Sequence, residues 1–217
     1  MVTALMGRPL HGLPFEPTAE ARLQQALGSL IAALHHSAPP RRTDHQVSDA
    51  HIAATVTATT TAHSPEPAAA AIEAKLERHL TTARPHLHTA DEALVRALAR
   101  QYASLPAAPL VPTHGDLQYR NLLVAPCGAP RLFDFERSEY ATATRDLVRL
   151  SDTWAGRPEL RAAFLDGYGR ELTPTEELRL RCETAFDSVS GIAYGTTHQD
   201  PEVTERAHRS LARLHAG

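Results

Sequence analysis

Three polar side chains that could share one chemical task lie close together in the sequence, between residues 111 and 137. Asp116 and Asn121 stand in a polar loop that also holds His114, and Asp134 follows a short apolar run. Short apolar runs divided by turn residues predict strands joined by tight connections. Side chains at the ends of such strands can converge, so this stretch predicts two carboxylates and a carboxamide at one point.

Phosphoryl transfer is the chemistry that these groups suit, because it depends mainly on positioning and on neutralisation of charge. Asp116 would orient an acceptor hydroxyl and take its proton. Asn121 and Asp134 would offer oxygen ligands to Mg²⁺, which would hold the phosphates of a nucleotide. A lone His-x-Asp loop is more often a turn with a capping aspartate. The joint pattern of loop, strand, turn, strand and second aspartate is much harder to obtain by chance.

The motif itself has the spacing of a kinase catalytic loop and metal-binding turn. Residues 114–121 read His-Gly-Asp-Leu-Gln-Tyr-Arg-Asn, and an apolar strand then leads to Asp134-Phe135-Glu136. Here the chain resembles the aminoglycoside phosphotransferase/choline kinase family, a small-molecule branch of the protein-kinase-like fold. The resemblance implies ATP as co-substrate, Mg²⁺ as cofactor and a small-molecule hydroxyl as acceptor.

The resemblance also assigns roles to residues of this chain. It implies Asp116, His114 and Asn121 as catalytic residues, and Asn121 and Asp134 as the ligands of the metal and its nucleotide. Glu136 of the Asp-Phe-Glu turn would support the site. Asp146 begins an Asp-Leu-Val segment that matches the family's helix start, and it would brace the catalytic loop through backbone hydrogen bonds. An ordinary first-turn aspartate, favoured by the helix dipole, would fit the same position.

Length and composition restrict the classes of protein to consider. The chain has 217 residues, a hydrophobic fraction of 42% and a formal charge of −3, which indicate a globular domain and give no reason to expect nucleic acid as a partner. It contains no apolar run long enough to cross a membrane. Its two cysteines fit a reducing cytoplasm rather than a disulfide framework. The scattered histidines, including His35-His36, are interpreted as solvated surface residues.

Apolar side chains at helical spacing account for most of the chain outside the motif. The clearest helix is expected from Pro17 to His36, where leucines form one stripe. Further helices are expected at Ala68–Leu80, after a capping box at Thr89–Glu92, from Asp146, from Pro158, after a capping box at Thr173–Glu176 and from Pro201.

The predicted fold is α+β and mostly helical. We interpret it as the C-terminal lobe of a protein-kinase-like fold, with a small β-hairpin sheet carrying the catalytic loop. Residues 1–16 would form a hinge-like segment, or else an ordinary N-terminal strand or frayed tail. Residues 17–217 would form the phosphotransferase lobe, interrupted at about 39–67 by an insertion rich in Thr, Ala and His.

The acceptor is not named by the sequence. In the resembled family the C-terminal helices wall the acceptor cleft, so Glu183, Asp187 and Asp200 could meet a cationic substrate. A solvated helix face explains each of these acidic residues at least as well.

Two parts of a complete kinase-like enzyme are missing from the sequence. It contains no Gly-x-Gly-x-x-Gly loop, and its only lysine, Lys75, lies in a predicted helix. The N-terminal lobe is therefore absent from this chain. A fragment or a late start codon, a truncated non-catalytic relative, or a separate chain that supplies the missing lobe would each explain this.

Two functions follow from these patterns. The first is ATP- and Mg²⁺-dependent phosphorylation of a small-molecule hydroxyl. The second is a catalytically inactive module that binds a ligand or partner. A phosphohydrolase that uses Asp116 and Asp134 is a weaker third interpretation, because no further cluster of metal ligands accompanies them.

Overall fold

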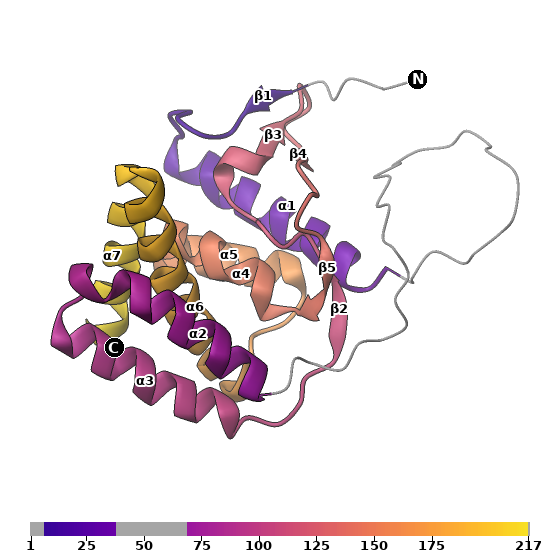
Figure 1. The fold of residues 1–217 in the computed structure, drawn as a ribbon. Coiled ribbons are helices and arrows are strands. Elements are labelled where there is room, and N and C mark those ends of the chain that lie inside the picture. Colours follow the sequence, from indigo (N-terminus) through magenta and orange to yellow (C-terminus); the bar gives the residue numbers. More distant parts are fainter. Residues whose placement is uncertain (1–6, 38–68, 217) are drawn as a thin grey trace, which may run out of the picture.

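The computed structural model describes residues 7–37 and 69–216. In this part of the chain, helices form most of the molecule and two small sheets lie along one side (Figure 1). The helices are α1 (Pro17–His35), α2 (Ala69–Ala83), α3 (Thr89–Ala103), α4 (Thr144–Leu150), α5 (Pro158–Tyr168), α6 (Pro174–His198) and α7 (Pro201–Ala216), with short 3-10 turns η1 (Arg84–His86), η2 (Tyr119–Asn121) and η3 (Ser151–Trp154). The insertion predicted at 39–67 lies outside the described residues.

The helices agree closely with the sequence pattern. Helix α1 spans the predicted segment to within one residue. Helix α2 continues past its predicted end because Ala83 is fully buried and extends the apolar stripe. At α6 the predicted capping box is confirmed, since the Glu176 amide donates to the Thr173 hydroxyl and the Thr173 amide donates to the Glu176 carboxylate.

The capping box predicted at the start of α3 was wrong by one residue. His88, not Thr89, is the N-cap, and Thr89 already lies inside the first turn. The Asp91 carboxylate accepts a hydrogen bond of 3.2 Å from the His88 amide, which makes His88 the N-cap residue. Glu92, which would have completed a box from Thr89, pairs instead with Arg84 and Arg96.

The strands confirm the apolar runs of the motif but pair in a way that the sequence did not predict. Strand β3 (Leu122–Val124) pairs antiparallel with β4 (Pro130–Leu132) and, on its other edge, with β1 (Arg8–Pro9). Strand β2 (Leu110–Thr113) pairs instead with β5 (Glu139–Thr142), which follows the motif. The loop of residues 114–121, for which a catalytic role is predicted, therefore connects two separate sheets; it is called the catalytic loop below for that prediction.

The segment at the start of the described chain is tied to the motif. Beyond the pairing of β1 with β3, the Leu10 amide donates to the Leu122 carbonyl at 2.9 Å, and the Leu10 side chain is buried. Residues 8–10 therefore do not form a frayed tail. The hinge role assigned to residues 1–16 remains a prediction, and residues 1–6 lie outside the described chain.

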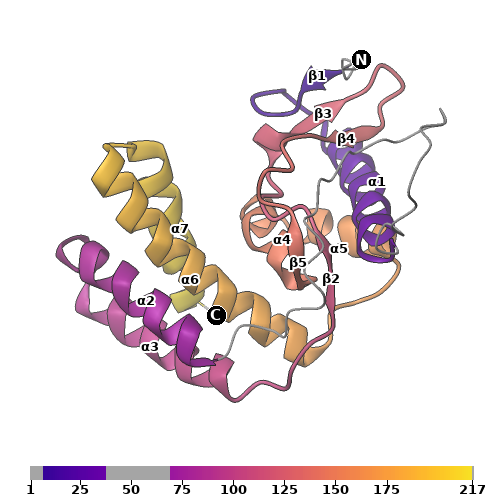
Figure 2. The same ribbon diagram turned by 45° about the vertical axis from the view of Figure 1, so that its right-hand side comes forward.

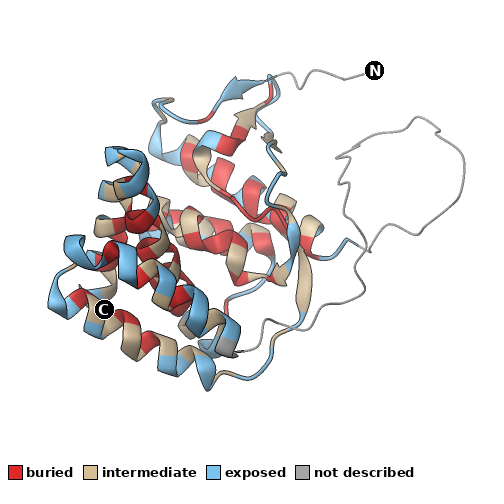
Figure 3. Ribbon diagram, in the orientation of Figure 1, coloured by how far each residue is buried: buried red, intermediate tan, exposed pale blue. Residues whose placement is uncertain are grey.

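Two hydrophobic cores lie on either side of α6 (Figures 2 and 3). The sheet-side core joins α1, α4, α5 and the catalytic loop, and the bundle core joins α2, α3, α6 and α7. Leu117 and Leu122 are both buried in the sheet-side core. They anchor the loop in its middle, directly after Asp116, and at its end, directly after Asn121.

Among the helices of residues 7–37 and 69–216, none combines the length and hydropathy that a membrane crossing requires.

Candidate active site

The loop between β2 and η2 begins with a turn that only glycine can make. Gly115 has a φ of +77°, and a Cβ built on it would lie 1.9 Å from the carbonyl oxygen of Arg137. A side chain here would collide with backbone that cannot move aside, and the positive φ would add strain. The turn brings the loop against the segment that follows Asp134.

Asp146, at the start of helix α4, stabilises the Gly115 turn. Its carboxylate accepts hydrogen bonds from the backbone amides of His114 at 2.9 Å and Gly115 at 2.8 Å, and the residue is completely buried. These are the bonds expected of an aspartate that braces the loop. Because both oxygens are used on backbone donors, Asp146 positions the loop rather than facing a substrate.

His35, at the end of α1, completes this support. Its Nε2 lies 3.1 Å from the Asp146 carboxylate, and its Nδ1 lies 2.8 Å from the Tyr168 hydroxyl. The interpretation of His35 as a solvated surface residue was wrong, because it is buried, whereas His36 is exposed. The apolar stripe of α1 places position 35 on the buried face, a signal that the sequence already contained.

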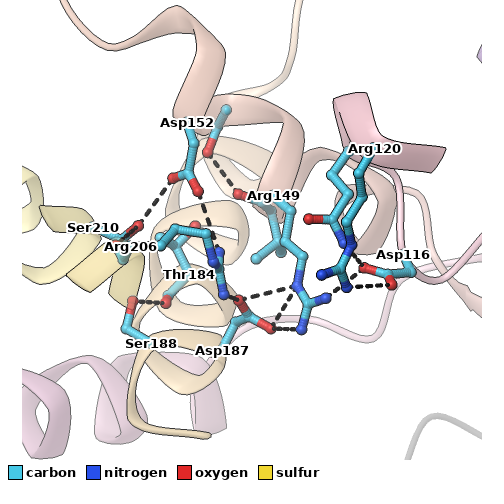
Figure 4. Close-up of polar contacts among 12 residues, drawn as sticks. Asp116, Arg120, Arg149, Asp152, Thr184, Asp187, Ser188, Arg206 and Ser210 are labelled. Carbon is cyan, nitrogen blue, oxygen red and sulfur yellow. Dashed lines mark hydrogen bonds and ion pairs between the residues drawn. The ribbon is translucent and has the colours of Figure 1, made fainter. Parts of the chain in front are cut away.

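Asp116 is buried and surrounded by donors (Figure 4). Its carboxylate accepts a hydrogen bond from Gln118 at 2.6 Å, pairs with Arg149 of α4, and lies 3.5 Å from the guanidinium of Arg120. Burial alone would raise the pKa of the Asp116 carboxyl. The positive charges of Arg149 and Arg120 outweigh burial and hold that pKa below its ordinary value, so the group is ionised at neutral pH.

Asn121 is buried at the other end of the loop. Its side-chain nitrogen donates to the backbone oxygen of Asp116 at 2.9 Å. The backbone carbonyl of Asn121 accepts from the Phe133 amide at 3.2 Å. With the nitrogen used in this way, the side-chain oxygen is the atom that Asn121 would offer to a cation. The two contacts tie Asn121 both to Asp116 and to the residue that precedes Asp134.

Asp134 follows β4 in an unusual backbone conformation. Its φ is +63°, which few residues other than glycine adopt, and its side chain is exposed. His114 stabilises this turn, since its Nε2 lies 2.8 Å from the Phe133 carbonyl and its ring packs on Phe135. Strained backbone held by its surroundings is common at functional sites. Glu136, in the same turn, is exposed.

The structure joins Asp116, Asn121 and His114 of the loop to one another and to the backbone of the residue before Asp134. The hydrogen bonds of His114, Asn121 and the Phe133 backbone join the catalytic loop to the turn that bears Asp134. Oxygen atoms of an aspartate and an asparagine are ligands that Mg²⁺ accepts, so this donor set fits the metal. In the described ranges, no group of three or more His, Cys, Asp or Glu side chains could hold a metal ion.

Arg149 is the functional candidate that sequence reasoning missed. Its guanidinium pairs with Asp116 and also makes three hydrogen bonds, of 3.0 to 3.3 Å, to Asp187 of α6. Arg206 of α7 contacts Asp187 at 2.8 Å from the other side (Figure 4). A basic residue one helical turn after the bracing Asp146 was the available signal, because residues three apart share a helix face.

The acidic residues considered for a cationic substrate have other partners. Asp187 lies between the two arginines just described. Glu183 is buried and accepts from the Thr142 hydroxyl at 2.8 Å. Asp200 caps α7 by accepting from the Val203 amide at 3.1 Å. None of the three forms a plain solvated helix face.

The arrangement of helices and small sheets matches that of solved small-molecule phosphotransferases. APH(2")-IIia, solved as its GDP and kanamycin complex, gives a TM-score of 0.67 at 18% identity, with 98% of this chain and 69% of that chain covered. Macrolide 2'-phosphotransferase type I gives 0.61 at 16% identity, covering 96% and 67%. A choline/ethanolamine kinase family protein from Mesorhizobium loti gives 0.57 at 18% identity, covering 92% and 61%. These likenesses establish the fold.

The family follows from the sequence. The Phosphotransferase enzyme family model matches residues 2–181, and the chain belongs to this family. No curated protein matched the chain in a sequence comparison. The chain spans about 61 to 69% of the length of the three solved structures just described.

Proposed function

We propose that this chain carries the phosphate-transferring site of an ATP- and Mg²⁺-dependent phosphotransferase that acts on a hydroxyl of a small molecule. The observation that carries the proposal is the set of contacts that joins Asp116, Asn121 and the Asp134 turn. Nucleotides are named in the complexes of several fold neighbours, with GDP, ADP and AMP among them. The nucleotide and the metal are proposals for this chain.

In this reaction the acceptor oxygen attacks the γ-phosphorus, the bond to the β-phosphate oxygen breaks, and ADP leaves. Asp116 would orient the hydroxyl and accept its proton, which its ionised state allows. Asn121 and Asp134 would hold Mg²⁺, which supplies charge neutralisation on the phosphates. His114 and Asp146 keep the loop and the Asp134 turn in register through the bonds described above.

The nucleotide base has a candidate place near the hinge-like segment. A hollow there is lined by Arg8, Leu13 and Phe15 on one side and by Val124 and Ala125 on the other. Strand β3 leads from this hollow to Asn121, so a nucleotide seated in it would extend its phosphates toward the predicted metal ligands.

Phosphate transfer tests this proposal directly. Purified protein would be mixed with Mg·ATP or Mg·GTP and a panel of cationic, neutral and anionic alcohols, and phosphorylated product would be measured by mass spectrometry. Loss of a general base typically slows catalysis by about 100-fold or more, which is the drop expected for Asp116→Asn. Asp166→Asn, at an exposed position on α5, serves as the matched control and keeps the wild-type rate. Equal rates in wild type and Asp116→Asn would contradict the assigned role.

The second candidate is a non-catalytic module that binds a ligand or partner. It is favoured by the position of Lys75, the chain's only lysine, which is exposed on α2 far from a strand. Calorimetric titration of Mg·ATP, combined with the transfer assay above, separates the two candidates. Nucleotide binding with product formation supports the enzyme, whereas no transfer to any alcohol in the panel supports the module.

A further inference from the structure

Three arginines contribute positive charge at Asp116. Arg149 approaches from α4 and Arg120 from η2, and Arg137 adds a longer-range positive field. The carboxylates that could have balanced them for a cationic acceptor are not available. Asp187 is paired with two arginines, and the Glu183 carboxyl is buried, with its pKa raised by that burial.

The two arginines differ in how much of their bonding capacity the protein uses. Arg149 is held by Asp187 and Asp116, and 19% of its side chain is exposed. Arg120 touches Asp116 only at 3.5 Å, the outer limit of a hydrogen bond, and 55% of its side chain is exposed. A guanidinium has five N–H donors in a planar fork that fits carboxylates and phosphates. Arg120 is thus placed beside the base with donors directed to solvent.

We propose that Arg120 selects an acceptor that bears an anionic group, a carboxylate or a phosphate, within a few bonds of its reacting hydroxyl. This inference rests on the proposed function and names its substrate class. The anionic group must lie near the reacting hydroxyl, because the Arg120 guanidinium lies 3.5 Å from the carboxylate of Asp116, the proposed base. Arg149 acts as a positioning residue that keeps Asp116 in place through Asp187 while Arg120 turns to the acceptor.

Calorimetry with simple alcohols tests the inference without requiring turnover. The probes are glycerate and glycerol 3-phosphate as anionic alcohols, glycerol as the neutral one and choline as the cationic one. Wild type is expected to bind at least one anionic probe more tightly than glycerol or choline. Arg120→Gln weakens that binding by about tenfold to a hundredfold, the usual range for a charge-assisted hydrogen bond. Glycerate and glycerol 3-phosphate separate a carboxylate site from a phosphate site.

Two further variants separate charge at this position from general effects. Arg120→Lys keeps the charge and restores part of the affinity. Arg209→Gln removes an exposed arginine of α7 that pairs only loosely with Glu205, and it leaves binding unchanged. Tight choline binding, absence of binding by both anionic probes, or equal affinities in wild type and Arg120→Gln would each overturn the inference.

The outcomes also distinguish this inference from the proposed function. Transfer of phosphate to choline but not to the anionic alcohols keeps the function and overturns the selectivity. Anion binding that depends on Arg120, without any phosphate transfer, keeps the selectivity and overturns the function. Where transfer to an anionic alcohol occurs, Arg120→Gln raises KM more than it lowers kcat, because the residue contacts the acceptor and not the transferred phosphate.

Discussion

At the scale of single residues, the site separates buried side chains that support the loop from those to which the proposed function assigns contact with the substrate. Asp146 and His35 are both buried. Asp146 accepts hydrogen bonds from the loop amides and contacts His35, whose other ring nitrogen contacts Tyr168. Asp116 and Asp134 lie at the ends of that supported loop and turn. A buried scaffold of this kind lowers the cost of orienting the reacting groups, because they are already in place before the substrate arrives.

Glu183 is the residue where support is incomplete. One carboxylate oxygen accepts from Thr142, but in the described chain the other, Oε2, is buried without a hydrogen-bond partner. Burial raises the pKa of Glu183 above its ordinary value. The folded protein therefore holds this proton more tightly than the unfolded chain does, and stability falls as pH rises from about 4.5 through the folded-state pKa.

Glu183→Gln should remove that dependence. We expect the variant to gain melting temperature relative to wild type at pH 8, and to gain less or nothing at pH 4, where the wild-type carboxyl is protonated. Thermal unfolding followed by circular dichroism across this range measures the difference. Glu205→Gln, on the exposed face of α7, should give the same difference at both pH values. A constant offset between Glu183→Gln and wild type at all pH values would show that Glu183 is not the group that titrates.

At the scale of elements, the closest helix contact holds α1 against α5, and therefore holds His35 under the loop. Glycines make this contact possible. A methyl group on Gly28 would lie 2.0 Å from the carbonyl oxygen of Phe164, and one on Gly167 would lie 1.8 Å from that of Gln25. Both obstacles are backbone atoms of well-packed helices, so neither can move aside easily.

Gly28→Ala should therefore destabilise the protein although alanine is the better helix former. The gain in helix propensity is about 1 kcal/mol, whereas forcing a methyl group into packed backbone costs roughly 3 kcal/mol or more. Urea unfolding would measure the net loss of stability. Ala33→Ser, on the exposed side of the same helix, should change stability by less than about 0.5 kcal/mol. A stabilised Gly28→Ala variant would mean that α1 and α5 lie further apart than described.

At the scale of the whole molecule, a chain of ion pairs crosses between the two cores. Arg149 of α4 meets Asp187 of α6, and Arg206 of α7 joins Asp187 to Asp152 of η3. Arg213 of α7 pairs with Asp152 as well. The network links the catalytic loop, through Asp116, to helices of the bundle core.

Asp187, at the centre of this ion-pair network, should make the free energy of unfolding depend on pH in the acid range. Burial opposes its charge, but Arg149 and Arg206 lower its pKa to about 2. Because this value lies below that of an unfolded aspartate, near 3.8, its stabilising contribution is complete above about pH 4 and is lost as pH falls toward about 2.

Asp187→Asn should cost about 3 kcal/mol at pH 7, because it removes the buried carboxylate that the part-buried Arg149 and Arg206 share. The variant should also lose less stability than wild type on acidification to pH 2. Urea unfolding at both pH values tests this, with Asp166→Asn as the exposed control. If Asp187→Asn matched wild type at pH 7, the ion pairs would contribute nothing to the link between the cores.

The sequence by itself determined the parts that depend on short-range order. Helix periodicity predicted α1, a capping box predicted the start of α6, and apolar runs on either side of residues 114–121 predicted a polar loop that leads into a strand. These signals arise within a few residues of one another, where the backbone's own geometry limits the choices. The box at α3 failed by one residue because two neighbouring positions could each serve as the cap.

Only the tertiary structure decided which distant side chains meet. Asp116 and Arg149 are 33 residues apart, Arg149 and Asp187 are 38 apart, and His35 and Asp146 are 111 apart. The pairing of β2 with β5 also joins segments that are distant in the sequence. Such contacts are chosen by packing and by the pairing of buried charges, which no local pattern specifies, and they determine the charges that lie beside Asp116.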